Sequence, residues 1–96
     1  MFWSKIFNTK YDILVAICDK ELLEKTIDKR LNIKAKKEFY GGRLIDEKIA
    51  IKIMEKATIG NLLGKKIVEL AEKNGFITRE NIILINGVPH AQFVKL

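Results

Sequence analysis

The sequence predicts a single small α+β domain, in which a mostly antiparallel sheet of four to five strands carries N- and C-terminal hairpins and two to three packed helices. Three observations lead to this fold class. The 96 residues suffice for one hydrophobic core but not for two, so residues 1–96 are expected to form one domain. Short apolar runs separated by turn-forming residues lie near both chain ends. Between them, apolar residues recur with helical spacing.

Two strands are expected at the N-terminus. Residues 2–7 are rich in aromatic and β-branched side chains, which favours a strand. Residues 8–10 then supply turn chemistry. Residues 11–18 hold an unbroken apolar run over 13–18, which is typical of a central strand covered on both faces or of a strand inside an interface. The two strands are therefore expected to form a hairpin.

The next part of the chain is expected to hold a short helix, a strand and a strained loop. Asp19 is a suitable N-cap for a helix over residues 20–26. Residues 31–36 alternate apolar and polar side chains, which is the pattern of a half-buried strand with one wet face. A glycine pair at 41–42 permits positive backbone angles, so we expect a tight loop over residues 38–43.

Helical periodicity dominates residues 46–74. Asp46 is placed to cap a helix with one apolar stripe and a neighbouring lysine stripe, each recurring every four positions. The stripes comprise Ile49, Ile53 and Ala57, and Lys48, Lys52 and Lys56. After a restart or kink at Thr58 the helical spacing continues through residue 74, where Gly75 is a suitable left-handed stop.

The C-terminal residues predict a second hairpin. A capped turn over residues 78–81 leads into a strand over 82–85, and the dipeptide Asn-Gly at 86–87 is a strong signal for a two-residue hairpin turn. The returning strand is expected over residues 88–96. Pro89 is tolerable in it only at its beginning, at an edge or at a bulge.

Charge and cysteine content bound the class of protein. Eighteen Lys and Arg against twelve Asp and Glu give a net charge of +6, which steers anionic partners. Fifteen of the basic residues are lysine and fifteen other positions are isoleucine, so an AT-rich genome or a hot environment explains the excess equally well. The single cysteine, the lack of a leader peptide and the lack of a bilayer-spanning apolar run predict a cytoplasmic protein without membrane contact.

No motif specifies a reaction. Residues 60–66 resemble a phosphate-binding loop, but the glycine spacing is one residue too short, Lys66 replaces the required Ser or Thr, and no strand is expected to precede the loop. Cys18 is interpreted as a small buried residue in preference to a nucleophile. One Cys and one His cannot build a four-ligand zinc site, unless a metal is shared across a dimer. No catalytic residue, metal ligand or cofactor is therefore expected.

A basic stretch with an aromatic residue inside it is the first candidate binding segment. It comprises Lys34, Lys36, Lys37, Tyr40 and Arg43. Such a surface could grip phosphates while an aromatic ring stacks on a base; the alternative is a solvated strand face that ends in a buried aromatic residue.

The second candidate segment holds the only proline, histidine and glutamine of the chain, Pro89, His90 and Gln92. His90 and Gln92 are two positions apart and so share one face of a strand. They are interpreted either as functional surface or as structural, with His90 satisfying a buried carbonyl of the glycine loop. We expect this segment and the loop of Tyr40, Gly41, Gly42 and Arg43 to lie side by side in one solvent-facing surface.

Nearly the whole chain resembles one known family. The stretches AICDKELL (16–23), FYGG (39–42), ATIGNLLG (57–64) and NGVPHAQ (86–92) are similar to an archaeal family of about this length, the domain-of-unknown-function family numbered four-two-four. The last stretch is the most specific. The resemblance implies an archaeal, cytoplasmic, stand-alone domain and supplies no catalytic residue. By analogy it favours a role with RNA or the ribosome.

The leading hypothesis is a non-enzymatic accessory protein that binds RNA or a ribonucleoprotein, in translation or at the ribosome. The second hypothesis is a protein-interaction module or homodimer that acts through an exposed sheet edge, supported by the apolar strand 13–18 and the aromatic residues at 2–3. These two hypotheses differ in whether the partner is nucleic acid or protein.

The third hypothesis is a small enzyme or ligand binder centred on His90, with Cys18, Tyr40 or Arg43 nearby. It requires a deep pocket closed around His90, or a histidine pKa well away from about 6.5.

Overall fold

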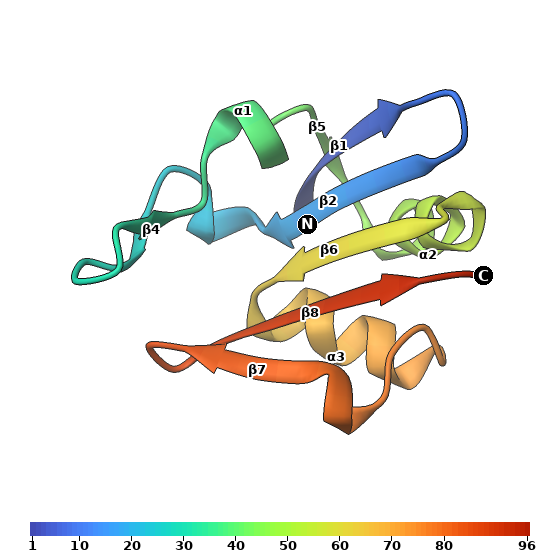
Figure 1. Ribbon diagram of the computed structural model, residues 1–96. Coiled ribbons are helices and arrows are strands. Elements are labelled where there is room, and N and C mark those ends of the chain that lie inside the picture. Colours follow the sequence, from blue (N-terminus) through green and yellow to red (C-terminus); the bar gives the residue numbers. More distant parts are fainter.

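Eight strands and three α-helices follow one another in the computed structural model, which describes all of residues 1–96 (Figure 1). The strands are β1 (Phe2–Asn8), β2 (Ile13–Asp19), β3 (Thr26–Asp28), β4 (Ile33–Lys34), β5 (Arg43–Ile45), β6 (Ile59–Leu63), β7 (Ile82–Ile85) and β8 (Val88–Val94). The helices are α1 (Lys37–Tyr40), α2 (Glu47–Lys56) and α3 (Lys65–Lys73), with 3₁₀ turns η1 (Lys20–Leu22) and η2 (Arg79–Asn81). No helix combines the length and the apolar character needed to cross a membrane.

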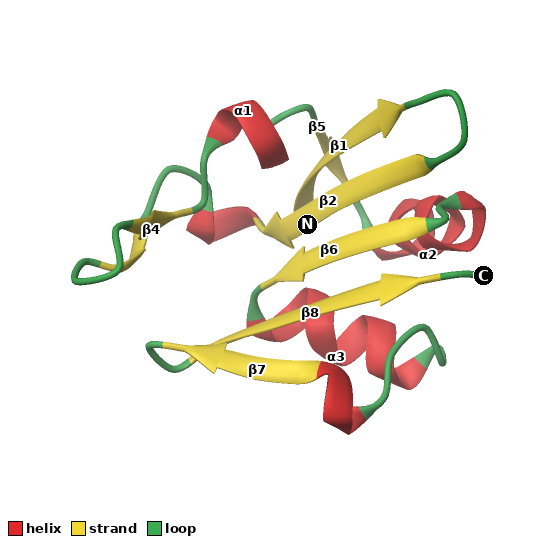
Figure 2. Cartoon of the chain, in the orientation of Figure 1, coloured by secondary structure: helices red, strands yellow, loops and turns green.

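Six of the strands form one mixed sheet in the order β5-β1-β2-β6-β8-β7, and β3 and β4 form a separate small sheet (Figure 2). All neighbours in the large sheet are antiparallel except the central pair, β2 and β6, which is parallel. The α+β class and both hairpins are confirmed. Asn86 and Gly87 have φ angles of 50° and 84°, as the positive angles of a type I′ turn require.

One face of the sheet, which we call the helical face, packs against α2 and α3; both helices lie behind the strands in Figure 1. Val15 and Ile17 of β2 and Leu62 of β6 point to this side and are fully buried with Met54 and Ile67 of the helices. The predicted apolar stripe of α2 thus enters the core. The apolar side chains on one face of the alternating strands therefore pack against the apolar stripes of the two helices in one cluster.

The opposite face is only partly covered. Residues 20–40, including α1, contribute to a second, smaller buried cluster, in which Ala16 and Cys18 of β2 lie under Tyr40. The Asn86 side chain donates a 3.0 Å hydrogen bond to the Ile27 carbonyl, which joins the β7–β8 turn to this covering segment. The cover therefore extends over one part of the face only.

The uncovered part of this face, which we call the open patch, is formed by β6, β7 and β8. Strand register places its members on one side of the sheet. They are Ile59, Asn61, Ile83, His90, Gln92 and Val94. Ile83 and Val94 are 57% and 63% exposed, and Gln92 is exposed as well. The patch therefore remains open to solvent.

The predicted helix over residues 58–74 is wrong in its first third. Residues 59–63 form β6, the strand between β2 and β8, and the helix begins only at Lys65. The apolar spacing of this stretch fits a helix, but pairing on both sides satisfies its backbone as a strand. This added strand, together with β5, extends the sheet to six strands and introduces the parallel pair.

Three shorter elements also differ from the prediction. The helix expected over residues 20–26 is only the 3₁₀ turn η1, with β3 beginning at Thr26, and the strand over 31–36 shortens to the two residues of β4. The expected loop at 38–43 begins with the last residues of α1 and ends in β5. Its glycines do not use positive φ; a Cβ on Gly42 would lie 2.6 Å from the Ser4 carbonyl oxygen, so close backbone approach explains the glycine.

Candidate functional site

Three polar side chains form a hydrogen-bonded row between α1 and the open patch. The Tyr40 hydroxyl donates to Asn61 Oδ1 at 2.8 Å, and His90 Nε2 lies 3.3 Å from the same oxygen. Tyr40 comes from α1, Asn61 from β6 and His90 from β8, so the row joins segments far apart in sequence. Tyr40 and His90, each predicted as a site residue, are thus brought together through Asn61.

Strand geometry positions this row. Asn61 lies directly opposite Gln92, while His90 is paired with Leu63 two positions further along β6. Side chains two apart on a strand point to the same side, so Asn61, His90 and Gln92 all face away from the helices. Pro89 precedes His90 on the helical face, and its carbonyl accepts a hydrogen bond from the Gly64 N–H at 2.8 Å. That bond holds the start of β8 against the end of β6.

Burial keeps the row uncharged at neutral pH. Desolvation lowers the pKa of the half-buried His90 below its usual value, which favours neutral imidazole. Burial also raises the pKa of the Tyr40 phenol, so it stays a hydrogen-bond donor. Because Asn61 Oδ1 is an acceptor, the neutral His90 ring must carry its proton on Nε2, which leaves Nδ1 as an acceptor.

The lysines of the first candidate segment lie at and just before α1. Lys34 forms a 3.2 Å ion pair with Glu24, whose other oxygen accepts the backbone N–H of Lys37 at 2.7 Å. These hydrogen bonds, that of the Lys37 N–H first, lower the pKa of the exposed Glu24. Lys36 and Lys37 are exposed and their side chains have no ion-pair partner in the chain. Two free cations therefore lie at the start of α1, the helix that carries Tyr40, and one paired cation lies in β4 just before it.

The glycine pair and Arg43 lie apart from His90, so the expected single surface is only partly formed. Arg43 begins β5, the edge strand at the opposite end of the sheet from β7. The β1, β2 and β6 strands separate β5 from β8. Gly41 and Gly42 pack against α1 and β1. The prediction that these residues and residues 89–92 share one surface is wrong, because residues 43–45 pair with β1.

Cys18 lies in the second core cluster below Tyr40 and is fully buried. Burial, reinforced by the nearby Asp19 and Glu21 carboxylates, raises the pKa of the Cys18 thiol to about 12. A thiol held protonated in this way is a poor nucleophile. No group of three or more His, Cys, Asp or Glu side chains is arranged to hold a metal ion.

Asp19 occupies the N-terminus of α3, where its two carboxylate oxygens accept the N–H groups of Lys66 and Ile67 at 3.0 and 2.9 Å. Burial raises its pKa, although these two bonds oppose the shift. The expectation that Asp19 caps the next turn in sequence is wrong. A strand does lead into the loop that resembles a phosphate-binding motif, but the Asp19 carboxylate fills the place that an anion would need.

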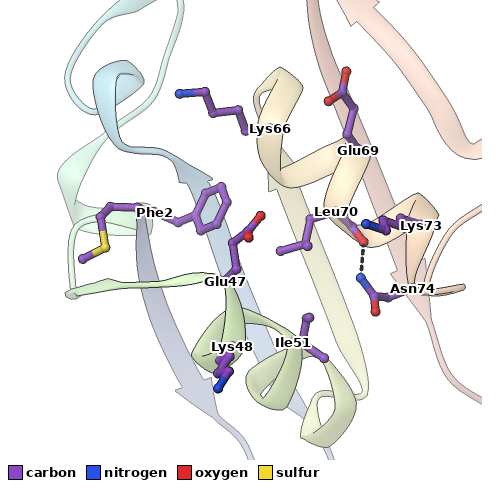
Figure 3. A pocket seen from close by; sticks show the side chains of 10 residues that line it. Phe2, Glu47, Lys48, Ile51, Lys66, Glu69, Leu70, Lys73 and Asn74 are labelled. Atoms are coloured by element: carbon purple, nitrogen blue, oxygen red, sulfur yellow. Dashed lines mark hydrogen bonds between the residues drawn. The ribbon is translucent and has the colours of Figure 1, made fainter.

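A hollow of about 540 Å³ lies on the helical side, between α2 and α3. In Figure 3, Phe2 and Leu70 turn toward it, and lysine and glutamate side chains stand around it. Sequence reasoning missed this hollow because its lining comes from separate elements. It does not include His90 or Cys18, so the hollow gives no support to an enzyme centred on His90.

Asn61 is the site residue that sequence reasoning missed. It was placed inside a predicted helix, where its side chain had no assigned partner. The available signal was a lone amide between Ile59 and Leu62 in an otherwise apolar stretch. Once residues 59–63 are recognised as a strand, alternation alone sends Asn61 to the face opposite Leu62.

Comparisons with known proteins give one family match and one structural match. Residues 7–96 match a family model described as "Protein of unknown function (DUF424)". The structure is similar to the crystal structure of an uncharacterized conserved protein from Methanopyrus kandleri, with a TM-score of 0.81 and 24% sequence identity over 99% of this chain and 93% of that chain. At this identity the similarity shows the fold alone. The sequence has no significant match among curated proteins.

Proposed function

The chain belongs to the DUF424 family of proteins of unknown function, and from this premise we propose that it is a non-enzymatic accessory protein of translation that binds RNA or a ribonucleoprotein in the cytoplasm. The observation that supports the proposal is the uncharged row of Tyr40, Asn61 and His90 beside a basic covering segment. Residues 20–37 of that segment hold seven basic and three acidic side chains. Hydrogen-bonding groups and cations thus border one another.

The two components would have separate tasks in RNA binding. Lysines neutralise phosphates and supply affinity that falls with salt, whereas polar groups on the sheet read shape and hydrogen bonds. Lys36 and Lys37 are free to contact phosphates. Lys34 is paired with Glu24, but an exposed pair of this kind is weak and can exchange its partner.

A charge-matched pair of variants tests the proposal. The double variant Lys36→Glu and Lys37→Glu changes charge at the site, while Lys48→Glu and Lys52→Glu makes the same change on the far side of the sheet. Binding of ribosomal RNA, followed by fluorescence anisotropy, is expected to weaken at least tenfold for the first double variant and much less for the second. Equal losses would show that only net charge matters.

The salt dependence gives a second measure of the same contacts. If about four phosphates of a single strand are neutralised, the logarithm of affinity should fall with the logarithm of salt concentration at a slope near −3. The double variant Lys36→Glu and Lys37→Glu should show a shallower dependence of affinity on salt concentration than the wild type. Affinity that does not change with salt would remove the electrostatic part of the proposal.

A second candidate function is a protein contact, and β7 is the edge that favours it. The two features that first indicated an interface are satisfied inside the chain, since strand 13–18 is covered on both faces and Trp3 packs on the second core cluster. The β7 edge, in contrast, has exposed Ile83 and Leu84 and no charged residue. Uncharged edges of this type pair readily with other strands.

Light scattering tests this second candidate. A dimer that is lost on Leu84→Lys, with RNA binding unchanged, would assign β7 to protein contact. A monomer at all concentrations whose partners from a cell lysate vanish after nuclease treatment would reject the β7 contact and favour the RNA proposal.

A further inference from the structure

The open patch is uncharged, whereas the chain as a whole is strongly charged. Charged residues make up 31% of the sequence, yet none occurs in the thirteen residues from 82 to 94. The two patch members from β6, Ile59 and Asn61, are uncharged as well. The basic segment of residues 20–37 lies over the neighbouring strands of the same face. The basic segment therefore lies next to the uncharged open patch.

The open patch presents hydrogen-bonding groups that have no partner in the chain. Asn61 Oδ1 is occupied by Tyr40 and His90, but Asn61 Nδ2 has no partner in the chain. His90 offers Nδ1 as an acceptor, and the exposed Gln92 amide offers both donors and an acceptor. Gln92 lies directly across from Asn61, so these groups sit on adjacent strands about 4.8 Å apart.

We propose, building on the RNA-binding function proposed above, that the ligand is single-stranded RNA in which one unpaired base lies on the open patch. The edge of the base would bond to Asn61, His90 and Gln92. Its flat face would contact the exposed Val94, which lies two positions beyond Gln92 on the same face of β8. The phosphates on either side of the base would then run along the basic segment, where Lys36 and Lys37 are free.

A duplex does not fit this arrangement. Double-stranded RNA keeps its bases paired and presents phosphates and 2′-hydroxyl groups on the outside. Laying phosphates on a neutral, partly apolar patch would remove their water without supplying a counter-charge. An unpaired base carries no charge on its ring and can expose both its edge and its face.

The test compares a labelled twelve-nucleotide single strand of mixed sequence with a hairpin duplex of the same length, by fluorescence anisotropy. The wild type is expected to bind the single strand at least tenfold more tightly. Gln92→Ala should weaken that binding roughly tenfold without changing its salt slope, because one or two hydrogen bonds are lost but no cation. Asn8→Ala, an exposed strand amide on the helical side, is the matched control and should change nothing.

A charge insertion separates base contact from phosphate contact on the patch. Val94→Lys should leave single-strand affinity unchanged or weaken it if a base lies there. Stronger binding by this variant would mean that phosphates lie on the patch, and that result would overturn the inference. Equal affinity for single strand and duplex would also overturn it while leaving RNA binding in place. Failure to bind either RNA at low salt would reject the proposed function and the inference together.

Discussion

The helical face and the open patch receive side chains from the same strands, but only the helical face is closed. On β6, Leu62 points to the helices and is fully buried, while its neighbour Asn61 points to the other side and is half-buried. On β8, Ala91 and Gln92 differ in the same way. One face thus supplies stability, and the other keeps polar groups within reach of solvent. Substitutions on the two faces should therefore have different consequences.

The largest contrast is expected between two aliphatic truncations. Leu62→Ala removes side-chain atoms from the closed core and should cost roughly 2 to 5 kcal/mol of unfolding free energy. Val94→Ala, on the open patch, should cost less than about 1 kcal/mol. Urea unfolding of both variants measures the difference. Similar costs would mean that the patch is covered in solution, for example by a second chain.

The next largest effect is expected at Gly64, which has a φ of 123°. A Cβ at this position would lie 2.4 Å from Asp19 Cγ, so Gly64→Ala should cost about 3 kcal/mol through strain and displacement of the cap. Gly87 also has positive φ but has open space around it, and Gly87→Ala should cost about 1 kcal/mol. Thermal or urea unfolding compares them. A neutral result for Gly87 would contradict the turn geometry.

Two helix caps sharpen the comparison between buried and exposed polar groups. Asp19→Ala leaves two N–H groups of α3 without their buried acceptor and should cost about 2 kcal/mol. Asp46→Ala removes an exposed cap of α2, which accepts the Ile49 N–H at 3.0 Å, and should cost about 1 kcal/mol. Equal costs in urea unfolding would show that burial of Asp19 adds nothing.

A smaller effect is expected for Tyr40→Phe. The variant loses the hydrogen bond to Asn61 but keeps the ring packing, so it should cost about 1 kcal/mol. Because Asn61 Oδ1 then has one donor only, His90 should be held less firmly, which the imidazole resonances in NMR spectra would report. An unchanged imidazole environment would show that the row does not act as a unit.

The smallest effect is expected from pH. Burial lowers the pKa of His90, so the unfolded chain binds its proton at a higher pH than the folded chain does. As the pH falls below about 6.5 toward the folded pKa of His90, the free energy of unfolding should decrease. Above that pH range His90 is neutral in both the folded and the unfolded chain, so its contribution to the free energy of unfolding is constant. The variant His90→Gln should lack this component when urea unfolding is compared between pH 8 and pH 5.

The sequence predicted those elements whose signals are local. The Asn86-Gly87 turn, the Asp46 cap and the two-sided apolar strand each depend on residues close in the chain, and each is found as predicted. The spacing of residues 59–63 predicts a helix, but these residues form a strand, because their partners β2 and β8 decide the conformation and neither is near in sequence.

The candidate site was predictable in part for the same reason. The segments of Tyr40 and His90 are predicted to lie side by side, and these two residues do meet, but Asn61, which joins them, lies in the segment predicted as helix. Arg43 is predicted at the site as a cation of the basic stretch around Tyr40. Its place on β5 depends on pairing with β1, which no local pattern indicated.

The strand order divides the sheet into two halves, each continuous in sequence, that meet only at the parallel pair β2 and β6. Ile13 and Thr58, which are hydrogen-bonded at this junction, lie 45 positions apart. Each half carries its own hairpin, which is a local contact that can form in microseconds, whereas the junction is a non-local contact that must offset the entropy of loop closure before it is stabilised. We expect docking of the two halves to limit the rate of folding. Fragments 1–57 and 58–96, prepared separately, should then reassociate into a native-like complex.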